Sequence, residues 1–144
     1  MGEPQEKLIE AARDAAERGA NSVGDPGKVG AAVRASDGGI YTGSVVSTED
    51  RHQTIHAERL AVTNAVTEHE EPNPIEAVAV NTALAVDEES SHARVCGSCL
   101  HFISEFSNGD IPIYIVHMLG ERETTLRTLY PEPWSKSSDS AEYP

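Results

Sequence analysis

The sequence has few cysteines and no long apolar run, and each shortage excludes a class of protein. Cys96 and Cys99 are the only cysteines among 144 residues, so a framework of several disulfides is excluded. In a reducing compartment, such a closely spaced pair is typical of a metal or redox site. No stretch approaches the roughly 20 apolar residues that a membrane span needs. Residues 1–7 lack the basic and apolar regions of a secretory signal, so we expect a cytoplasmic protein without a membrane partner.

Basic residues are also scarce. Lys7, Lys28 and Lys136 are the only lysines, and the formal net charge is −13. Binding to a nucleic-acid backbone needs clustered Lys and Arg, so we expect no nucleic-acid partner. The acidic residues are scattered over most of the length, which is typical of a solvated acidic surface, including one adapted to high salt. A halophilic source is our hypothesis for the low lysine content.

The apolar pattern predicts one α/β domain over residues 1–134, followed by a disordered tail over 135–144. We expect a helix over 4–20, a hairpin of strands 28–36 and 40–46, and a loop over 47–54. The pattern then predicts a helix over 57–66, a buried strand over 75–83, a loop over 87–94, a helix over 96–106 and a strand over 111–117. Residues 124–130 fit either a last strand or a short helix. This order favours a partly parallel sheet with helices packed on it.

Two short segments carry the residues that suggest chemistry. His56 and Glu58 begin one expected helix, and Cys96 and Cys99 begin another. Catalytic zinc takes three protein ligands and leaves the fourth position for water, and His56, Cys96 and Cys99 supply three. A helix N-terminus favours the thiolate form that binds metal. We therefore predict one Zn²⁺ per subunit, held by these three residues.

Glu58 is the predicted catalytic residue. Zinc lowers the pKa of its bound water to about 7, and a carboxylate beside that water can move protons to a ring nitrogen and a leaving amine. A His-x-Glu motif alone occurs mostly by chance. A Cys-x-x-Cys motif alone also fits a redox pair or half of a structural zinc site. Together they match the H-x-E…C-x-x-C signature of zinc deaminases. Among the other histidines, His101 is the strongest candidate for a further role because it follows Cys99 by two.

With these motifs, residues 8–134 resemble the cytidine deaminase family of small nucleoside-acting enzymes. The resemblance is carried by segments 8–12, 29–32, 40–43, 56–59, 96–99 and 125–131. It implies a three-layer α/β/α sandwich on a mixed five-stranded sheet. It also implies a homotetramer whose active sites borrow residues from neighbouring subunits.

Several positions depart from the pattern of the family. These enzymes usually have cysteine at His56, arginine at Leu100 and proline at Val95. Two thiolates and a neutral imidazole leave a Zn²⁺ site at zero charge, whereas three thiolates leave it at −1. A site at zero needs less nearby cation, so the loss of the arginine is consistent with the gain of His56, while Arg59 is retained.

The residues that hold the substrate in the family are not found at the expected positions. The resemblance places its base-stacking phenylalanine at Gly27 and its ribose-holding Asn and Glu at Val45 and Ser47. Ala57 and Glu49 complete our candidates for substrate binding, and Asp50 or Arg51 of the same loop are alternatives. A site that loses such polar groups discriminates its substrate differently. We therefore expect weak or altered ribose recognition.

The sequence thus predicts zinc-dependent hydrolytic deamination of cytidine, deoxycytidine or a related aminopyrimidine, with release of ammonia. In enzyme terms this is a hydrolase acting on C–N bonds of cyclic amidines. One alternative is the same chemistry on another amine, such as a nucleoside antibiotic, a free base or another amino-heterocycle. A second alternative is a non-catalytic, zinc-stabilised binding module.

Overall fold

The computed structural model describes residues 2–82, 95–117 and 120–133. The elements in chain order are α1 (Glu3–Ala16), β1 (Ala20–Asn21), β2 (Gly30–Ala35), β3 (Ile40–Ser44), β4 (Val46–Ser47), η1 (Arg51–Gln53), α2 (Ala57–Val66), β5 (Ile75–Asn81), α3 (Gly97–Phe106), β6 (Pro112–His117), β7 (Gly120–Thr125) and α4 (Leu126–Leu129). The loop predicted over 87–94 and the tail predicted over 135–144 lie outside the described residues. Within those ranges no helix has the length and apolar character to cross a membrane.

Five strands form one mixed sheet in the order β3-β2-β5-β6-β7. Only β5 and β6 are parallel, and α3 lies between them in the chain, while the other neighbouring pairs are antiparallel. A parallel pair needs a crossover connection, which explains why a helix separates these two strands. The mixed α/β sheet predicted from the sequence is therefore confirmed.

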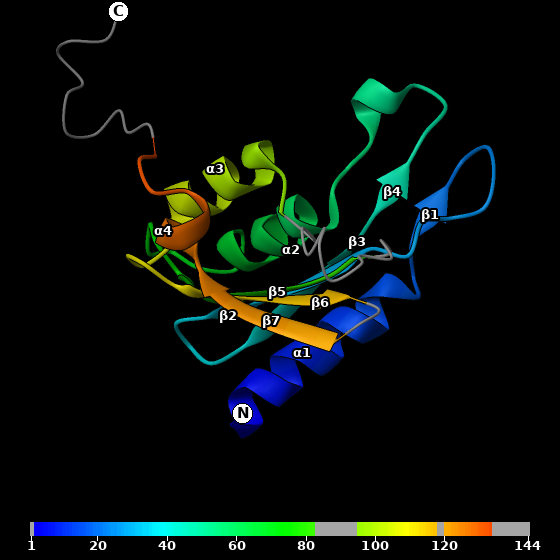
Figure 1. The fold of residues 1–144 in the computed structure, drawn as a ribbon. Helices are drawn as coiled ribbons and strands as arrows, with labels where there is room; N and C mark the ends of the chain where they lie inside the picture. Colours follow the sequence, from blue (N-terminus) through cyan, green and yellow to red (C-terminus); the bar gives the residue numbers. More distant parts are fainter. Residues whose placement is uncertain (1, 83–94, 118–119, 134–144) are drawn as a thin grey trace, which may run out of the picture.

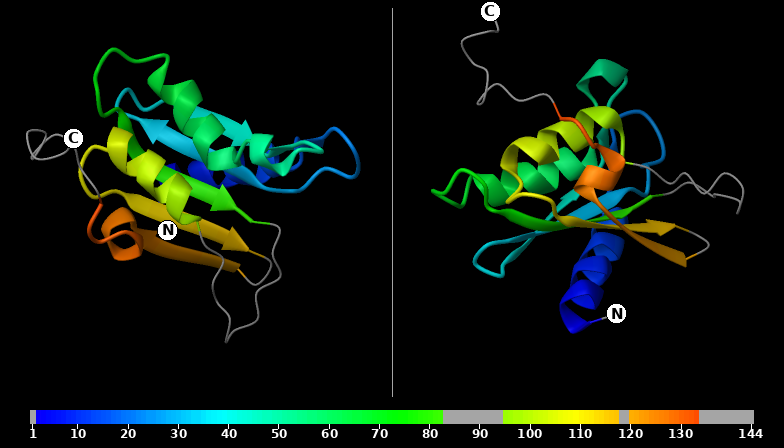
Figure 2. Two further views of the ribbon diagram at one scale, coloured as in Figure 1. Left: turned by 90° about the horizontal axis from the view of Figure 1, so that it is seen from above. Right: turned by 60° about the vertical axis from the view of Figure 1, so that its left-hand side comes forward.

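Helices cover both faces of the sheet, so the molecule has three layers (Figures 1 and 2). α1 lies on one face, and α2, α3 and α4 lie on the other. Alternate residues of each central strand supply the two cores, because successive side chains point to opposite faces. In β5, Val78 and Val80 join the core beneath α2 and α3, whereas Ala77 and Ala79 join the core beneath α1.

Small residues let the helices approach the sheet closely. A Cβ added to Gly30 of β2 would lie 2.2 Å from Ala16 N in α1. A Cβ added to Gly43 of β3 would lie 2.4 Å from Ala57 O and 2.5 Å from Ala61 N in α2. Real Cβ atoms essentially never come this close to other backbone atoms. The first turn of α2 is therefore seated directly on the backbone of β3.

The first helix is shorter than predicted, because residues 20 and 21 form strand β1 and not a last helical turn. α1 ends at Ala16 instead of residue 20, and Ala20 is exposed in β1. β1 pairs in parallel with β4, with Ala20 opposite Val46 and Asn21 opposite Ser47. Alanine recurs at helical spacing up to residue 20, so the pattern did not reveal this long-range pairing.

Two other predicted boundaries also differ from the structure. The strand predicted over 40–46 is divided, because the backbone of Val45 turns from the main sheet toward β1 and its carbonyl accepts a hydrogen bond from Ala20 N. The segment predicted as strand or helix over 124–130 contains both, the end of β7 and then α4. β7 begins earlier, at Gly120, and is a mostly polar edge strand, so it lacks the apolar alternation that predicts a strand.

Candidate zinc site

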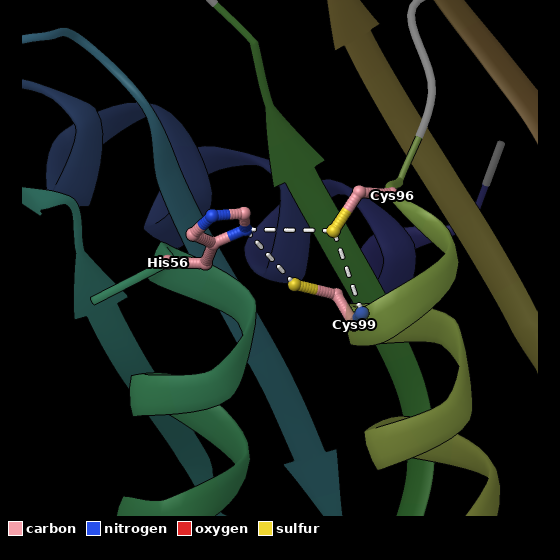
Figure 3. Close-up of side chains that lie close together, drawn as sticks. All are labelled: His56, Cys96 and Cys99. Atoms are coloured by element: carbon pink, nitrogen blue, oxygen red, sulfur yellow. Dashed lines mark hydrogen bonds between the residues drawn. The ribbon is translucent and has the colours of Figure 1, made fainter. Parts of the chain in front are cut away.

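The N-termini of α2 and α3 lie side by side above the sheet, and each begins with a potential metal ligand (Figure 3). His56 is the N-cap of α2, and Cys96 is the N-cap of α3. Both caps have extended backbone, which turns their side chains away from the helix axis and toward the space between the two helices. Cys99 points into the same space from the first turn of α3.

The three ligand atoms are close enough to share one metal ion. His56 Nδ1 lies 3.2 Å from Cys99 Sγ and 3.5 Å from Cys96 Sγ. All three atoms lie within 4.8 Å of one another, and no other such group of potential ligands occurs in the part of the chain that the structure describes. Tetrahedral zinc, with bonds of about 2.3 Å to sulfur and about 2.0 Å to nitrogen, places its N and S ligands about 3.5 Å apart. The donor set and spacing therefore fit zinc.

The start of α3 also holds the sulfur of Cys96 in place. The backbone N–H of Cys99 donates to Cys96 Sγ at 3.4 Å, as a capping side chain would accept it. Val95, just before the helix, is buried in the core and anchors the approach to Cys96. An apolar side chain here holds the turn by packing, at the position where the family resemblance expects proline.

Glu58 is buried beside the ligands. Its residue is only 5% exposed, although it carries a carboxyl group, and Cys99 is fully buried. Burial raises the pKa of the Cys99 thiol, and the negative charge of Glu58 and its hydrogen bond to Cys99 raise that pKa further. Glu58 therefore lies within reach of the ligand group, where a bound cation would offset the clustered negative charge.

A pocket of about 520 Å³ opens beside the imidazole of His56. It is lined by Asn21, Val23, Ser47, Thr48, Glu49, Arg51, Thr54 and His56. These residues come from β1, β4, η1 and the segments that follow them, which Figure 1 shows on one side of the molecule. A molecule in this pocket would lie next to the metal ligands, so it is the candidate substrate pocket.

The structure separates the five candidate substrate-binding residues into two groups. Ser47 and Glu49 line the pocket. Gly27 and Val45 lie against each other and not in the pocket lining, since a Cβ added to Gly27 would touch Val45 Cγ1 at 3.4 Å. Ala57 is fully buried in the core, and its carbonyl faces β3. These last three residues do not line the pocket.

Asp50 and Arg51, the alternative candidates for substrate binding, also differ in their positions relative to the pocket. Asp50 caps η1, where its carboxylate accepts from His52 N at 3.1 Å, whereas Arg51 lines the pocket. Asn21 and Thr54 line it too, and the sequence analysis missed both. Asn21 lies just beyond the helix predicted over 4–20, and only its pairing with Ser47 in the small parallel sheet brings it there. No local pattern carries that signal.

Two other residues near the motifs have contacts away from the ligands. His101 Nδ1 lies 3.0 Å from the Tyr130 hydroxyl, and His101 Nε2 lies 3.4 Å from Glu105. The guanidinium of Arg59 lies over the Phe102 ring, 4.9 Å from its centroid. His101 therefore links α3 to the segment after α4, and Arg59 links α2 to α3.

Known proteins share both the sequence and the fold. A family model described as "Cytidine and deoxycytidylate deaminase zinc-binding region" matches residues 2–115. Cytidine deaminase of Sporosarcina psychrophila is 36% identical over 109 residues, which are 75% of this chain and 75% of that protein. Cytidine deaminase 2 of Arabidopsis thaliana is 39% identical over 83 residues, which are 56% of this chain and 23% of that protein.

Solved structures agree with these matches. The cytidine deaminase of Burkholderia pseudomallei superposes with a TM-score of 0.77 at 27% identity, covering 93% of this chain and all of that one (100%). The cytidine deaminase of Mycobacterium tuberculosis gives a TM-score of 0.64 at 26% identity, covering 91% and 97%. Sequence, fold and ligand geometry agree, and the chain belongs to the family of zinc-dependent cytidine and deoxycytidylate deaminases.

Proposed function

We propose that this protein hydrolytically deaminates cytidine, deoxycytidine or a related aminopyrimidine and releases ammonia. The observation that carries the proposal is the convergence of His56, Cys96 and Cys99 next to the buried carboxylate of Glu58. Three ligands suit a catalytic zinc, which keeps one position open for water. A structural zinc would be expected to have four protein ligands.

In this proposal, His56, Cys96 and Cys99 hold one zinc ion per subunit. Zinc bound there supplies a Lewis acid that lowers the pKa of water to about 7. Glu58 would accept one proton from the attacking water and deliver it to the ring nitrogen. It would then move the remaining proton, from the hydroxyl added to the ring, to the amine, so that the C–N bond breaks, the ring carbonyl forms and ammonia leaves. Burial of Glu58 keeps this carboxylate out of bulk water, where its proton transfers would compete with solvent.

The substrate contacts in this proposal come from the 45–55 segment. Ser47 and Glu49 line the pocket and offer a hydroxyl and a carboxylate to the polar part of the substrate. Gly27, Val45 and Ala57 do not line this pocket and are therefore not expected to contact the substrate there. Among the described residues, no Phe, Tyr or Trp lines the pocket, so we expect base stacking and ribose recognition to be weaker than in a site with a phenylalanine. Ordinary cytidine kinetics would contradict this expectation.

Replacement of Glu58 tests the proposed chemistry. Glu58→Gln should keep zinc near one equivalent per chain, because the three ligands remain, and should lower kcat by about 10²-fold or more. Zinc is measured by atomic absorption, and ammonia release is screened over cytidine, deoxycytidine, cytosine and other aminated heterocycles. Unchanged turnover in Glu58→Gln would refute the role of this carboxylate. A zinc-loaded wild-type protein that deaminates none of the panel would favour the binding module.

We further propose a cytoplasmic homo-oligomer, either a dimer or a tetramer. The family resemblance and the exposed apolar side chains of Val23, Ile40 and Ile55 support this assembly. Ile55 precedes the ligand His56, so a neighbouring subunit that covered it would also lie near the pocket. Light scattering after gel filtration measures the mass, and a monomer at micromolar concentration would contradict this part of the proposal.

A further inference from the structure

We propose that a pocket between the start of α1 and the β2–β3 hairpin binds the phosphate or carboxylate group of a small molecule. This inference goes beyond the proposed deaminase function and does not depend on it. It is carried by the guanidinium of Arg34, which has a buried nitrogen without a partner, and by the position of Lys7 on the same pocket.

The pocket lies apart from the candidate zinc site. Its volume is about 390 Å³, which is in the range of sites that hold small-molecule ligands. It is lined by Glu3, Pro4, Lys7, Arg34, Gly38 and Ile40, so it shares no residue with the candidate substrate pocket. Figure 1 shows the start of α1 at the end of the molecule remote from β1 and β4, which carry part of the substrate pocket. A ligand bound here would therefore leave the zinc ligands free.

Arg34 holds a positive charge in the wall of this pocket at a cost in free energy. Its backbone is fixed in the sheet, because it pairs with Ile40 of β3 on one side and with Ala77 of β5 on the other. The residue is half-buried, and Arg34 Nη1 is buried without a hydrogen-bond partner among the described residues. An N–H group that has lost water without gaining an acceptor destabilises the folded state.

The buried nitrogen distinguishes Arg34 from the other basic residues. Within the described ranges, the other buried side-chain atom that lacks a hydrogen-bond partner is His69 Nε2, and it lies 3.2 Å from Asp37 Oδ2. Arg122 and Arg127 have no acidic partner among the described residues either, but neither has a buried nitrogen of this kind. Arg34 is therefore a cation that the fold keeps partly out of water without compensating it.

Lys7 brings a second cation to the pocket from a different element. Its Nζ lies 3.3 Å from Oε1 of Glu3, one turn earlier on α1, and both side chains are exposed. An exposed ion pair of this kind is weak, so Lys7 can turn from Glu3 to a ligand. Two cations and one carboxylate leave the pocket positive in a chain with a net charge of −13, and the positive end of the α1 dipole adds to this field.

These groups suit an oxyanion. A guanidinium presents paired N–H donors that match two oxygens of a phosphate or carboxylate, and an ammonium adds a mobile point charge. The guanidinium charge is shared over its three nitrogens, so an anion beside the exposed part of Arg34 would also offset the cost of the part that is buried. A phosphate or carboxylate thus supplies what the described residues do not.

The test measures the binding of inorganic phosphate and of acetate to the zinc-loaded protein. Each salt replaces KCl at constant ionic strength, so that general screening does not change, and the apparent Kd follows from the rise of the melting temperature with anion concentration. Arg34→Gln should weaken binding of the preferred anion about tenfold or more, as expected for lost charge-assisted hydrogen bonds. Lys7→Gln should weaken it less. The two arms distinguish phosphate from carboxylate.

Two further variants serve as controls. Arg122 is also half-buried on a strand, but it lies on β7 outside this pocket, so Arg122→Gln should leave the Kd unchanged. Glu3→Gln should tighten binding, because it removes the repulsion of the anion and frees Lys7. Opposite shifts in Arg34→Gln and Glu3→Gln would not follow from a general loss of stability.

Arg34→Met separates the ligand from the stability of the fold. It keeps a long side chain but removes the buried nitrogen, so in chloride it should melt at or above the temperature of wild-type protein. In the preferred anion, wild-type protein should gain stability that this variant does not gain. No rise of the melting temperature with either anion, or an equal Kd in wild-type protein, Arg34→Gln and Arg34→Met, would overturn the inference. Deaminase activity is not measured, so this result would leave the proposed function standing.

Discussion

At the scale of single residues, the site brings Glu58 and Cys99 together, and their negative forms repel each other unless a cation is bound. Cys99 is fully buried, and the carboxylate of Glu58 raises the pKa of its thiol beyond the effect of burial. Burying two negative groups side by side costs free energy, and a bound cation offsets this cost by attracting both groups. The metal therefore contributes to folding as well as to chemistry, since its binding energy adds to the stability of the folded chain.

The ligand assignment predicts different outcomes for two nearby residues. Cys99→Ser should reduce bound zinc to well below one equivalent, because a hydroxyl is a poor replacement for a thiolate ligand. His101→Gln should retain the metal, because His101 contacts Tyr130 and Glu105 instead of the three ligands. Zinc content is measured after dialysis against a weak chelator. Loss of zinc from His101→Gln would contradict the assignment.

At the scale of elements, the site depends on how closely α2 lies against β3. Gly43 has no side chain, and the backbone of the first turn of α2 occupies the space that a Cβ would need. This turn follows His56 and carries Glu58. The position of one glycine on an edge strand therefore controls the placement of a ligand and of the proposed proton carrier.

Gly43→Ala should disturb both stability and metal binding. The added methyl would lie 2.4 Å from Ala57 O, so α2 must move, at a cost of about 1–3 kcal/mol for overpacking. Urea denaturation and zinc titration measure the two effects. Gly24→Ala is the control, because its nearest neighbour is a side-chain atom at the ordinary distance of 3.7 Å. Equal behaviour of the two variants would show that β3 does not position α2.

The other end of α2 is tied to the β2–β3 turn by His69. The ring lies between two acceptors, with Nδ1 2.7 Å from Ala65 O and Nε2 3.2 Å from Asp37 Oδ2. The hydrogen bond to the Ala65 carbonyl raises the pKa of His69, and the charges of Asp37 and Glu71 raise it further against the opposing effect of burial. Tyr41 packs edge-on against the ring, 5.6 Å between centroids. The protonated imidazole is the form that suits both acceptors.

This contact predicts a pH-dependent stability. Because the pKa of His69 in the folded state is above its ordinary value of 6.5, its stabilising effect is full below that value and is lost as pH rises through the folded pKa. The melting temperature of wild-type protein should therefore exceed that of His69→Gln most at pH 6, and the difference should shrink by pH 9. Asp37→Asn should behave in the same direction. A difference in melting temperature that is constant with pH would contradict stabilisation by protonated His69.

At the scale of the whole molecule, the formal net charge of −13 is the dominant feature. Like charges spread over one small domain repel one another and destabilise the compact state, and salt screens this repulsion. The ion pair of Lys7 with Glu3 on α1 is exposed to solvent and therefore contributes little to stability. This charge is the basis of our hypothesis that the protein is adapted to a medium of high ionic strength.

Added KCl should raise stability and activity if the acidic surface reflects a halophilic source. Screening of the repulsion predicts a melting temperature that increases between dilute buffer and molar KCl. The zinc-loaded protein is compared by scanning calorimetry and by deaminase assay across this range. Full activity and an unchanged melting temperature in dilute buffer would contradict the hypothesis.

The sequence-based prediction of the fold was accurate where local interactions set an element and inaccurate where long-range pairing did. The helix over 57–66 was predicted with its observed boundaries, because its apolar face repeats locally. The start of β7 was missed because this edge strand is mostly polar, although its partner β6 is adjacent in the chain. The end of α1 and the division between β3 and β4 depend on the pairing of β1 with β4, which are distant in the chain. Such pairing leaves no periodic pattern in the paired segments themselves.

For the site, the sequence by itself determined the donor set, because an imidazole, two thiols and a carboxylate at these spacings limit the chemistry that a metal can perform. It also determined the acidic surface. Tertiary structure alone decided which side chains line the candidate substrate pocket. Asn21 and Arg51 line one pocket with Ser47 and Glu49, whereas Val45 and Ala57 do not. Ligand chemistry is a property of residue types, but the lining of a pocket depends on how separate segments pack, which no local pattern encodes.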